Sequence, residues 1–218
     1  MSEVHELSDP ASWWRTLCWV TDRLIVTGDL PLEPQPARRQ LTKWVESGVT
    51  HVVDVRRERN DEAFVKAHAP HVEYLWAPTR DYGGPQPDSW FAHSTEWILK
   101  ALAADPEAVV LVHCHMGVNR APSLAMAVLL EMGYSPTEAL DAIRTARPIA
   151  GIEYADQASD WFHYWHDSPA EVRWAARHAI DVWHLDHPVD VSWVISRIAQ
   201  RGAIEEMTGD YGEPGEAA

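Results

Sequence analysis

The stretch AVVLVHCHMGVNRAPSLAMAVLL, residues 108–130, decides the fold of this chain. Its first part, residues 109–112, is an apolar run long enough for one buried strand. Its last part, residues 121–130, is apolar on almost every side, as in a buried helix. A cysteine, a glycine and an arginine lie between the two. The pattern predicts a strand, an anion-binding loop and a helix N-terminus in succession, with a nucleophile inside the loop.

The loop between the strand and the helix has the chemistry of a phosphate site. Gly117 allows the backbone angles that let consecutive N–H groups converge on one anion. Arg120 begins the helix, where a guanidinium can hold two phosphate oxygens. The same positive field favours the thiolate form of Cys114. The predicted phosphate-binding residues are therefore His115, Met116, Gly117, Val118, Asn119 and Arg120.

A buried structural cysteine at a strand end is the alternative interpretation, because isolated C-x5-R spacings also occur by chance. The preceding strand, the internal glycine and the following apolar helix all favour the phosphate site.

Segments with strand and helix patterns alternate around this stretch. The expected strands are residues 19–27, 50–55, 72–77 and 109–112, and the expected helices are residues 36–47, 60–68, 88–104, 121–130 and 135–145. Such alternation predicts an α/β fold with a central, mainly parallel sheet flanked by helices. Functional sites in such sheets lie at the carboxyl ends of the strands, which is where the loop after residue 112 belongs.

The C-terminal part of the chain is expected to be a separate helical extension. We assign residues 1–167 to the catalytic domain, 168–206 to the extension and 207–218 to a disordered tail. Ser168 to Glu171 has the pattern of a capping box that opens a helix with Val172, Ala176, Ala179 and Trp183 turned inward. Asp190 is expected to cap a second helix that ends at Gly202.

Composition excludes several classes of partner and cofactor. A formal charge of -15 argues against nucleic acid and anionic membranes as main partners. Two cysteines form no disulfide framework, and the N-terminus has no apolar signal segment, so a cytoplasmic location is expected. The pairs His163/His166 and His184/His187 have metal-like spacing but no neighbouring cysteine or placed carboxylate, so neither a metal nor another cofactor is expected.

The segment HCHMGVNRAPS resembles the signature H-C-x-x-G-x-x-R of the cysteine-dependent protein tyrosine phosphatases, most closely the dual-specificity branch. DRLIVTGDL, GVTHVVDV, EYLWAPTRD and AIRTARPI are similar to successive segments of that family in the same order. The resemblance covers about residues 19–165 and implies a protein tyrosine phosphatase-like fold.

The resemblance also implies roles for individual residues. Cys114 would form a cysteinyl-phosphate, Arg120 would stabilise the charge on the transferred phosphoryl group, and His113 would fix the loop and tune the thiolate. The family usually has serine or threonine directly after the arginine, where the hydroxyl assists release of the thiolate. This chain has Ala121 there, so the second step is expected to be slow unless Ser123 substitutes.

The leaving group needs a proton, and two aspartates are candidates for the general acid. Asp81 follows a predicted strand, begins a glycine-containing loop and lies 33 residues before Cys114, close to the family's spacing of about thirty. Asp88 stands just before a predicted helix, where its simplest role is N-capping. We therefore assign the acid to Asp81.

The sequence leaves the roles of four arginines undecided. Arg56, Arg57 and Arg59 follow a predicted strand, either in a solvated loop with Glu58 and Asp61 as partners or as a rim that attracts phosphorylated substrate. Arg147 is a candidate for a second anion contact.

The leading hypothesis is a metal-independent phosphatase that acts through a cysteinyl-phosphate on phosphotyrosine, with phosphoserine and phosphothreonine open as further targets. Its partner is a phosphorylated protein or a small phosphate monoester, and the oligomeric state is left open. A phosphoinositide or nucleotide phosphatase of the same superfamily is the first alternative, disfavoured because the loop contains no lysine. A phosphate-binding pseudo-phosphatase and a sulfurtransferase are further alternatives. The latter is disfavoured by the long loop.

Overall fold

A computed structural model of the protein describes residues 9–211. Its centre is a five-stranded sheet with strand order β1-β2-β5-β3-β4. The strands are β1 (Cys18–Trp19), β2 (Leu24–Thr27), β3 (His51–Arg56), β4 (Glu73–Thr79) and β5 (Val110–His113). Only the short edge strand β1 runs antiparallel to its neighbour, and the other pairings are parallel. The predicted central, mainly parallel sheet is thus confirmed.

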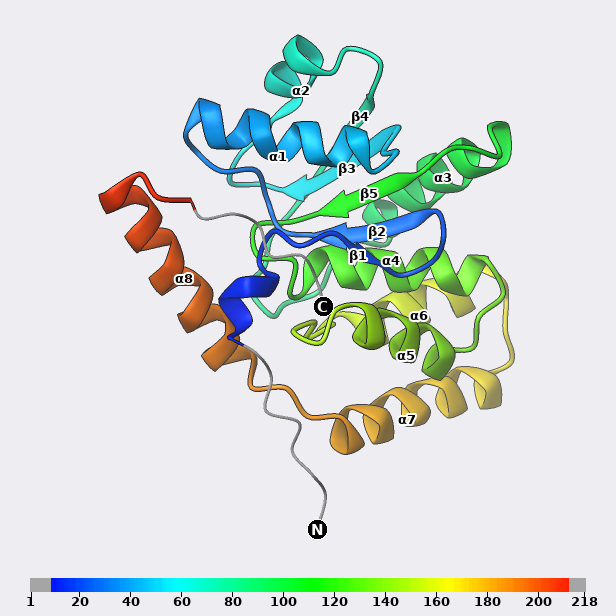
Figure 1. The fold of residues 1–218 in the computed structure, drawn as a ribbon. Coiled ribbons are helices and arrows are strands. Elements are labelled where there is room, and N and C mark those ends of the chain that lie inside the picture. Colours follow the sequence, from blue (N-terminus) through cyan, green and yellow to red (C-terminus); the bar gives the residue numbers. More distant parts are fainter. Residues whose placement is uncertain (1–8, 212–218) are drawn as a thin grey trace.

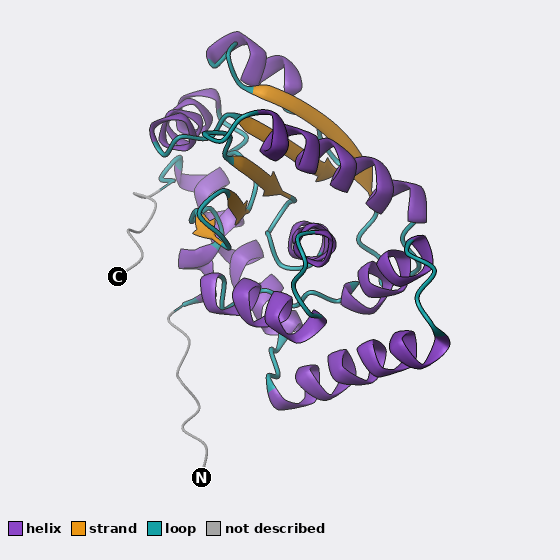
Figure 2. Cartoon of the chain, turned by 90° about the vertical axis from the view of Figure 1, so that its right-hand side faces the viewer, coloured by secondary structure: helices purple, strands orange, loops and turns teal. Residues whose placement is uncertain are grey.

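Helices cover both faces of this sheet (Figures 1 and 2). One face carries α1 (Pro34–Glu46) and α2 (Glu62–His68). The other face carries α3 (Asp88–Ala104), α4 (Arg120–Glu131), α5 (Pro136–Ala146) and α6 (Ala155–Trp165), with α4 packed directly on β2 and β5. Because both faces are covered, the central strands β2 and β5 are buried along their whole length, whereas the edge strand β4 is partly exposed.

The side chains of β5 show how the two layers are separated. Val110 and Val112 point into the core under α4, whereas Leu111 points into the core under α1, beside Trp44. A strand buried on both faces is apolar at every position, and this explains the unbroken apolar run that precedes His113.

The parallel register brings four strand ends to one edge. Thr27 of β2 and Asp54 of β3 both pair with His113 of β5, and Arg56 of β3 pairs with Thr79 of β4. The loops that follow β2, β3, β4 and β5 therefore meet at the carboxyl edge of the sheet.

Two further helices extend the fold beyond the sheet layers. Helix α7 (Ala170–Asp186) is outermost in Figure 1 and packs on α5 and α6, with Ile180 and Trp183 joining the main core. Helix α8 (Val191–Thr208) instead packs on the short 3-10 helix η1 (Pro10–Trp13) through Val194 and Ile198, which contact the cluster around Trp14. The expected C-terminal helices are present, and they are docked at two different places.

Three expectations about local structure were wrong. The single strand expected at residues 19–27 is a hairpin, because Val20 N–H bonds Leu24 O (2.8 Å) and turns the chain. Ser168 does not cap α7, since its hydroxyl bonds His163 Nδ1 (3.0 Å) and Pro169 occupies the N-cap. Val172, expected to face inward, is 45% exposed.

The end of α8 also differs from the prediction. The helix continues through Gly202, where a Cβ would approach the ring of Trp14 to 3.2 Å, so the glycine permits close packing instead of ending the helix. Gly209, with φ 67°, is the left-handed cap. Residues 207 and 208, assigned to the tail, are therefore helical, and residues 212–218 lie outside the described part. No helix among residues 9–211 is long and apolar enough to cross a membrane.

Candidate active site

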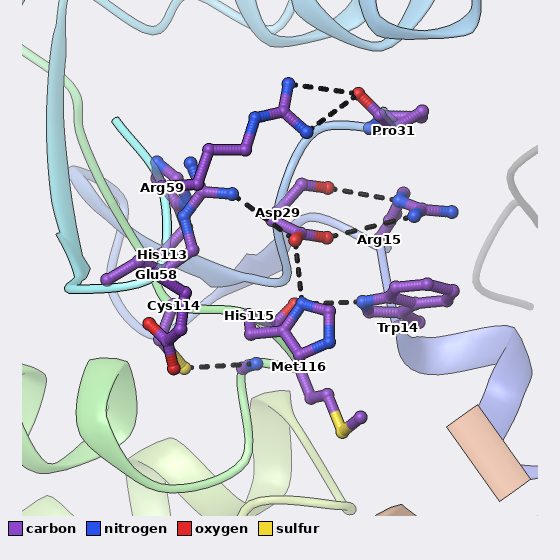
Figure 3. A network of polar contacts seen from close by, with 12 residues as sticks. Trp14, Arg15, Asp29, Pro31, Glu58, Arg59, His113, Cys114, His115 and Met116 are labelled. Carbon is purple, nitrogen blue, oxygen red and sulfur yellow. Dashed lines mark hydrogen bonds and ion pairs between the residues drawn. The ribbon is translucent and has the colours of Figure 1, made fainter. Parts of the chain in front are cut away.

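Cys114 lies at the carboxyl end of β5, where the strand gives way to the loop before α4. The residue is buried, with 1% of its surface exposed. The backbone N–H of Gly117 donates to its Sγ at 3.2 Å, the contact drawn as a dashed line in Figure 3. This contact directs the positive end of a peptide dipole at the sulfur, as expected at the centre of an anion-binding loop.

The loop carbonyl groups are held outward by other parts of the chain, beginning at His115. Trp14 Nε1 donates to His115 O at 2.9 Å, and the backbone N–H of Asp29 donates to the same oxygen at 3.0 Å. The His115 ring, which is half exposed, bonds Asp29 through Nδ1 at 2.8 Å (Figure 3). The segment after β2 and Trp14, the residue directly after η1, thus fix the first residue of the loop.

Arg147 and Gly151 hold the next three carbonyl groups. Arg147, which is fully buried, donates from Nη2 to Met116 O (2.8 Å) and from Nε to Gly117 O (2.6 Å). Gly151 N–H donates to Val118 O at 2.8 Å. Four consecutive carbonyl groups therefore point away from the centre of the loop, which leaves its N–H groups to face inward, as in an anion-binding nest.

Arg147 does not act as a second anion contact in this arrangement. Its Nη2 also donates to Trp14 O at 3.1 Å, and its Nη1 donates to Thr16 O at 3.4 Å and to Cys18 Sγ at 3.2 Å. None of its donors is directed at the inside of the loop. Arg147 therefore holds the shape of the loop and does not contact a bound anion.

Only glycine fits at position 117. Its φ is +67°, in the left-handed region, and a Cβ there would lie 2.7 Å from Thr27 O and 2.5 Å from Arg147 Nη2. The glycine in the sequence motif is therefore required by both backbone angle and space.

Arg120, the first residue of α4, is oriented by groups from two other strand ends. Its Nη1 donates to Glu58 Oε2 (2.8 Å) and to Thr79 O (3.1 Å), and its Nε lies 3.4 Å from Asp81 Oδ2. Burial by itself would lower the pKa of Arg120, but Cys114, Glu58 and Asp81 together raise that pKa above its usual range. The structure therefore brings the predicted nucleophile, arginine and acid to one place.

Asp81 is held by a residue from the other side of the site. Tyr154 Oη donates to Asp81 Oδ1 at 2.8 Å and accepts from Gly83 N–H at 3.2 Å. Burial raises the pKa of Tyr154 to about 12, with Asp81 contributing, so the phenol stays protonated and remains a donor. Gln86 N–H also bonds Gln157 Oε1 (2.7 Å), which ties the acid loop to α6 a second time.

Asp88 has neither of the two roles considered for it. It is the first residue of α3, Pro87 occupies the N-cap and no side-chain capping bond forms, so the capping prediction was wrong. Its carboxylate is exposed and makes no contact with Arg120 among the described residues.

His113 lies above a buried network of charges. Its ring is packed against Trp44, with centroids 5.4 Å apart, and its Nε2 lies 3.8 Å from Asp54 Oδ1. Burial lowers the pKa of His113, so the ring is neutral. Within residues 9–211 neither ring nitrogen has a hydrogen-bond partner, and the position next to Cys114 is set by packing.

Arg56 is the centre of that network and not a residue of a solvated loop. It bonds Asp54 through Nε (2.9 Å) and Nη2 (2.8 Å), and it also pairs with Asp61 (2.5 Å) and with Asp29 (3.3 Å). Burial opposes the charge, but these carboxylates raise the pKa of Arg56 above its usual range. The solvated interpretation therefore fails for Arg56, which is 1% exposed. Arg59 pairs with Asp61 at 2.7 Å, as that interpretation expected, whereas Arg57 is exposed and its role stays open.

Three positions around the start of α4 complete the site. Asn119 donates from Nδ2 to Glu153 at 2.9 Å. Ala121 is fully buried in the main core. Ser123 is also fully buried, and its Oγ accepts from Tyr154 N–H at 3.3 Å, which leaves the hydroxyl hydrogen available to donate.

Sequence reasoning missed three residues of this site. Trp14 and Tyr154 lie outside the motif, and no local pattern distinguishes them from packing aromatics. Glu58 was noted as a partner of neighbouring arginines, but it pairs with Arg120, 62 positions away. The only sequence signal for Glu58 was its place after a strand that runs parallel to β5.

The metal-like histidine pairs are engaged in other contacts. His163 bonds Ser168, His166 bonds Glu131 and His187 bonds the Trp183 carbonyl. The part of the chain that the structure describes contains no group of three His, Cys, Asp or Glu side chains that could hold a metal ion.

Comparison with known proteins gives one family. Residues 33–161 match the family model described as the catalytic domain of dual specificity phosphatases. Human dual specificity protein phosphatase 5 is 29% identical over 107 residues, which cover 49% of this chain and 26% of the human protein. Mouse protein tyrosine phosphatase type IVA 2 is 32% identical over 116 residues, which cover 51% of this chain and 68% of the mouse protein.

Solved structures show the same fold. A crystal structure of a variant of human DUSP28 superposes with a TM-score of 0.56 at 22% sequence identity. The match covers 69% of this chain and 97% of that one. The comparison says nothing about the part of this chain that lies outside the match.

Proposed function

This chain belongs to the dual specificity phosphatase family, and on that premise we propose that it hydrolyses phosphate monoesters, phosphotyrosine in proteins first, through a cysteinyl-phosphate and without a metal. The observation that carries the proposal is the meeting of three groups at one sheet edge. The backbone N–H of Gly117 donates a hydrogen bond to Cys114 Sγ, and the Arg120 guanidinium contacts both Glu58 and Asp81. Phosphoserine and phosphothreonine are further candidate substrates.

The first chemical step forms a sulfur–phosphorus bond. The Cys114 thiolate attacks phosphorus while the bond from phosphorus to the leaving oxygen breaks. Inward N–H groups of residues 115–119 and the Arg120 guanidinium stabilise the charge on the three phosphoryl oxygens. Asp81 donates its proton to the leaving oxygen, which departs as an alcohol or phenol.

The second step returns the enzyme to its starting state. Water attacks phosphorus, the Asp81 carboxylate takes a proton from that water, and the sulfur–phosphorus bond breaks to give the thiolate and inorganic phosphate. A hydroxyl after the arginine would assist the departing thiolate, but this chain has the methyl group of Ala121. Ser123 Oγ accepts from Tyr154 N–H and keeps its own hydrogen to donate, but among the described residues it makes no hydrogen bond to Cys114 Sγ, so we expect it to assist weakly.

The test is hydrolysis of p-nitrophenyl phosphate in the presence of EDTA, with vanadate as inhibitor. Wild-type protein should turn over this substrate, and Cys114→Ser should lose activity while binding vanadate or phosphate in the same site. Equal rates for wild type and Cys114→Ser would overturn the mechanism. An inactive wild type that still binds phosphate would identify a phosphate-binding pseudo-phosphatase instead.

The acid is tested by a matched pair of variants. Asp81→Asn should lower kcat by about 10²- to 10⁴-fold, the range for loss of general acid catalysis, whereas Asp88→Asn should leave kcat within about twofold. The effect of Asp81→Asn should shrink with a substrate whose leaving group needs no proton. Loss of rate in Asp88→Asn alone would refute the assignment.

A phosphoinositide or nucleotide substrate is the alternative within the same superfamily. The loop from Cys114 to Arg120 contains no lysine, and the chain carries a formal charge of -15, so neither feature favours a polyanionic headgroup. Comparing kcat/KM for a phosphotyrosine peptide with that for a soluble phosphoinositide headgroup decides between them.

We further propose a cytoplasmic location, because a nucleophilic thiolate survives best where thiols are kept reduced. Cys18 and Cys114 are both free, which is consistent with that compartment. Imaging of the tagged protein in cells tests this.

A further inference from the structure

A pocket lies between the end of β4, the loop that follows it and Arg57 after β3. Its volume is about 510 Å³. It is lined by two arginines, two aromatic rings and prolines of the loop, chiefly Arg57, Trp76, Arg80, Tyr82, Pro85 and Pro87. Nothing in the proposed chemistry uses these side chains.

The pocket is adjacent to the catalytic groups. Thr79, part of its wall, accepts from Arg120 through its backbone oxygen (3.1 Å), and Asp81 lies between the lining residues Arg80 and Tyr82. A substrate whose phosphate is bound by the loop at Cys114 therefore has its neighbouring groups within reach of this pocket.

Both aromatic rings are exposed and yet fixed in position. Trp76 is 42% exposed, and its Nε1 donates to Arg56 O at 2.8 Å. Tyr82 is 62% exposed, its hydroxyl donates to Pro85 O at 3.2 Å, and its ring packs on Gly84, where a Cβ would lie 2.3 Å from it. Aromatic rings that are already fixed in position lose little conformational entropy when a ligand binds. Trp, Tyr and Arg are also the residues most often found at binding hot spots.

The charge of the pocket is opposite to that of the chain. Arg57 and Arg80 are exposed, and among residues 9–211 neither forms a salt bridge, although the whole chain has a formal charge of -15. The lining contains no carboxylate. The pocket is therefore a local positive site whose guanidinium groups could bind a carboxylate supplied by a ligand.

We propose that this pocket binds an acidic side chain close to the phosphorylated residue of a polypeptide substrate. This inference rests on the proposed phosphatase function and names its substrate class. The two arginines bind the carboxylate, and Trp76, Tyr82 and the prolines pack against the peptide beside it. A peptide reaches a small local pocket, whereas the negative charge of the whole chain repels an extended anionic lipid surface.

The experiment compares two phosphotyrosine peptides that differ only in their flanking residues. One carries two glutamates on each side of the phosphotyrosine, and the other carries glutamines at those positions. Wild-type protein should prefer the glutamate peptide by about fivefold in kcat/KM, in line with exposed ion pairs, and the preference should shrink as sodium chloride rises from 50 to 500 mM. The double variant Arg57→Ala/Arg80→Ala should lose the preference, and Arg38→Ala, an exposed arginine of α1, should keep it.

The same preference should appear in binding, measured as the ratio of Kd values on the Cys114→Ser background. Equal kcat/KM for the two peptides with an active wild type would overturn the pocket assignment and leave the phosphatase function standing. A preference that persists in Arg57→Ala/Arg80→Ala would also overturn it, as would a soluble bisphosphorylated headgroup that is hydrolysed faster than either peptide. Absence of hydrolysis of both peptides and of p-nitrophenyl phosphate would refute the underlying function instead.

Discussion

At the scale of single residues, Asp81, the proposed general acid, is held by a tyrosine from a distant part of the chain. Tyr154 lies 73 positions after Asp81, and its hydroxyl bonds both the carboxylate and the Gly83 N–H of the same loop. The acid loop is otherwise exposed and glycine-containing, so an anchor of this kind limits where Asp81 can lie.

We therefore expect Tyr154→Phe to lower kcat for p-nitrophenyl phosphate by about tenfold, the cost of one hydrogen bond to a charged group, with little change in KM. The reason is that the ring still packs but no longer positions Asp81. Steady-state kinetics measures this, with Tyr164→Phe on exposed surface as control. A pure KM effect would show that Tyr154 contacts substrate instead.

Ala121 stands at the position where the resemblance to the family implies a serine or threonine. If release of the thiolate limits turnover, p-nitrophenol should appear in a burst followed by a slower steady state. Ala121→Ser should raise the steady-state rate and leave the burst rate unchanged. Rapid-mixing kinetics measures both, and a slower burst in the variant would show that the buried hydroxyl disturbs the loop instead.

At the scale of elements, the phosphate loop depends on four neighbours for its shape. The carbonyl groups of residues 115–118 are bonded by Trp14 directly after η1, by the segment after β2, by Arg147 at the end of α5 and by the segment before α6. None of these groups touches the reacting atoms. They fix which side of each peptide faces the phosphate.

Arg147→Lys should damage both stability and phosphate binding. A lysine has three donors and cannot replace the five hydrogen bonds of the guanidinium, so buried carbonyl oxygens remain unpaired. We expect a loss of at least about 2 kcal/mol in the free energy of unfolding and weaker inhibition by vanadate. Urea unfolding measures the first.

Arg173→Lys is the control for Arg147→Lys, because Arg173 donates to a single backbone oxygen, Ser168 O. Its free energy of unfolding should change by less than about 0.5 kcal/mol. Comparable losses in the two variants would contradict the scaffold role of Arg147.

At the scale of the whole molecule, stability should depend on pH through buried neutral histidines. Burial lowers the pKa of His113, and also of His51, His163 and His184, below the ordinary value of 6.5. The unfolded chain therefore binds more protons than the folded protein below that value. Stability is full above pH 6.5 and is lost as pH falls from there toward the folded pKa values.

Urea midpoints between pH 7.5 and pH 5.5 test this expectation. The midpoint should fall with pH in the wild type, and the fall should be shallower in His113→Gln but unchanged in His71→Gln, an exposed position. A wild-type midpoint that rises toward pH 5.5 would contradict the sign.

The sequence by itself determined the fold class and the chemistry at the centre of the site. The apolar strand and helix around Cys114, the glycine at 117 and the arginine at 120 follow from local rules of burial and backbone geometry. Asp81 followed from its place after a strand, at the start of a glycine-containing loop, and from the spacing to the cysteine that the family resemblance implies. These are short-range relations, which a single sequence contains.

Only the tertiary structure decided what holds those residues in place. Glu58, Tyr154 and Arg147 act across 62, 73 and 30 positions, and such pairings depend on strand order and register, which local patterns do not encode. The same limit explains the errors at Arg56 and Gly202. A charged residue after a strand is normally solvated, and a glycine normally ends a helix, unless another element packs against them. Here three aspartates surround Arg56, and Trp14 lies against Gly202.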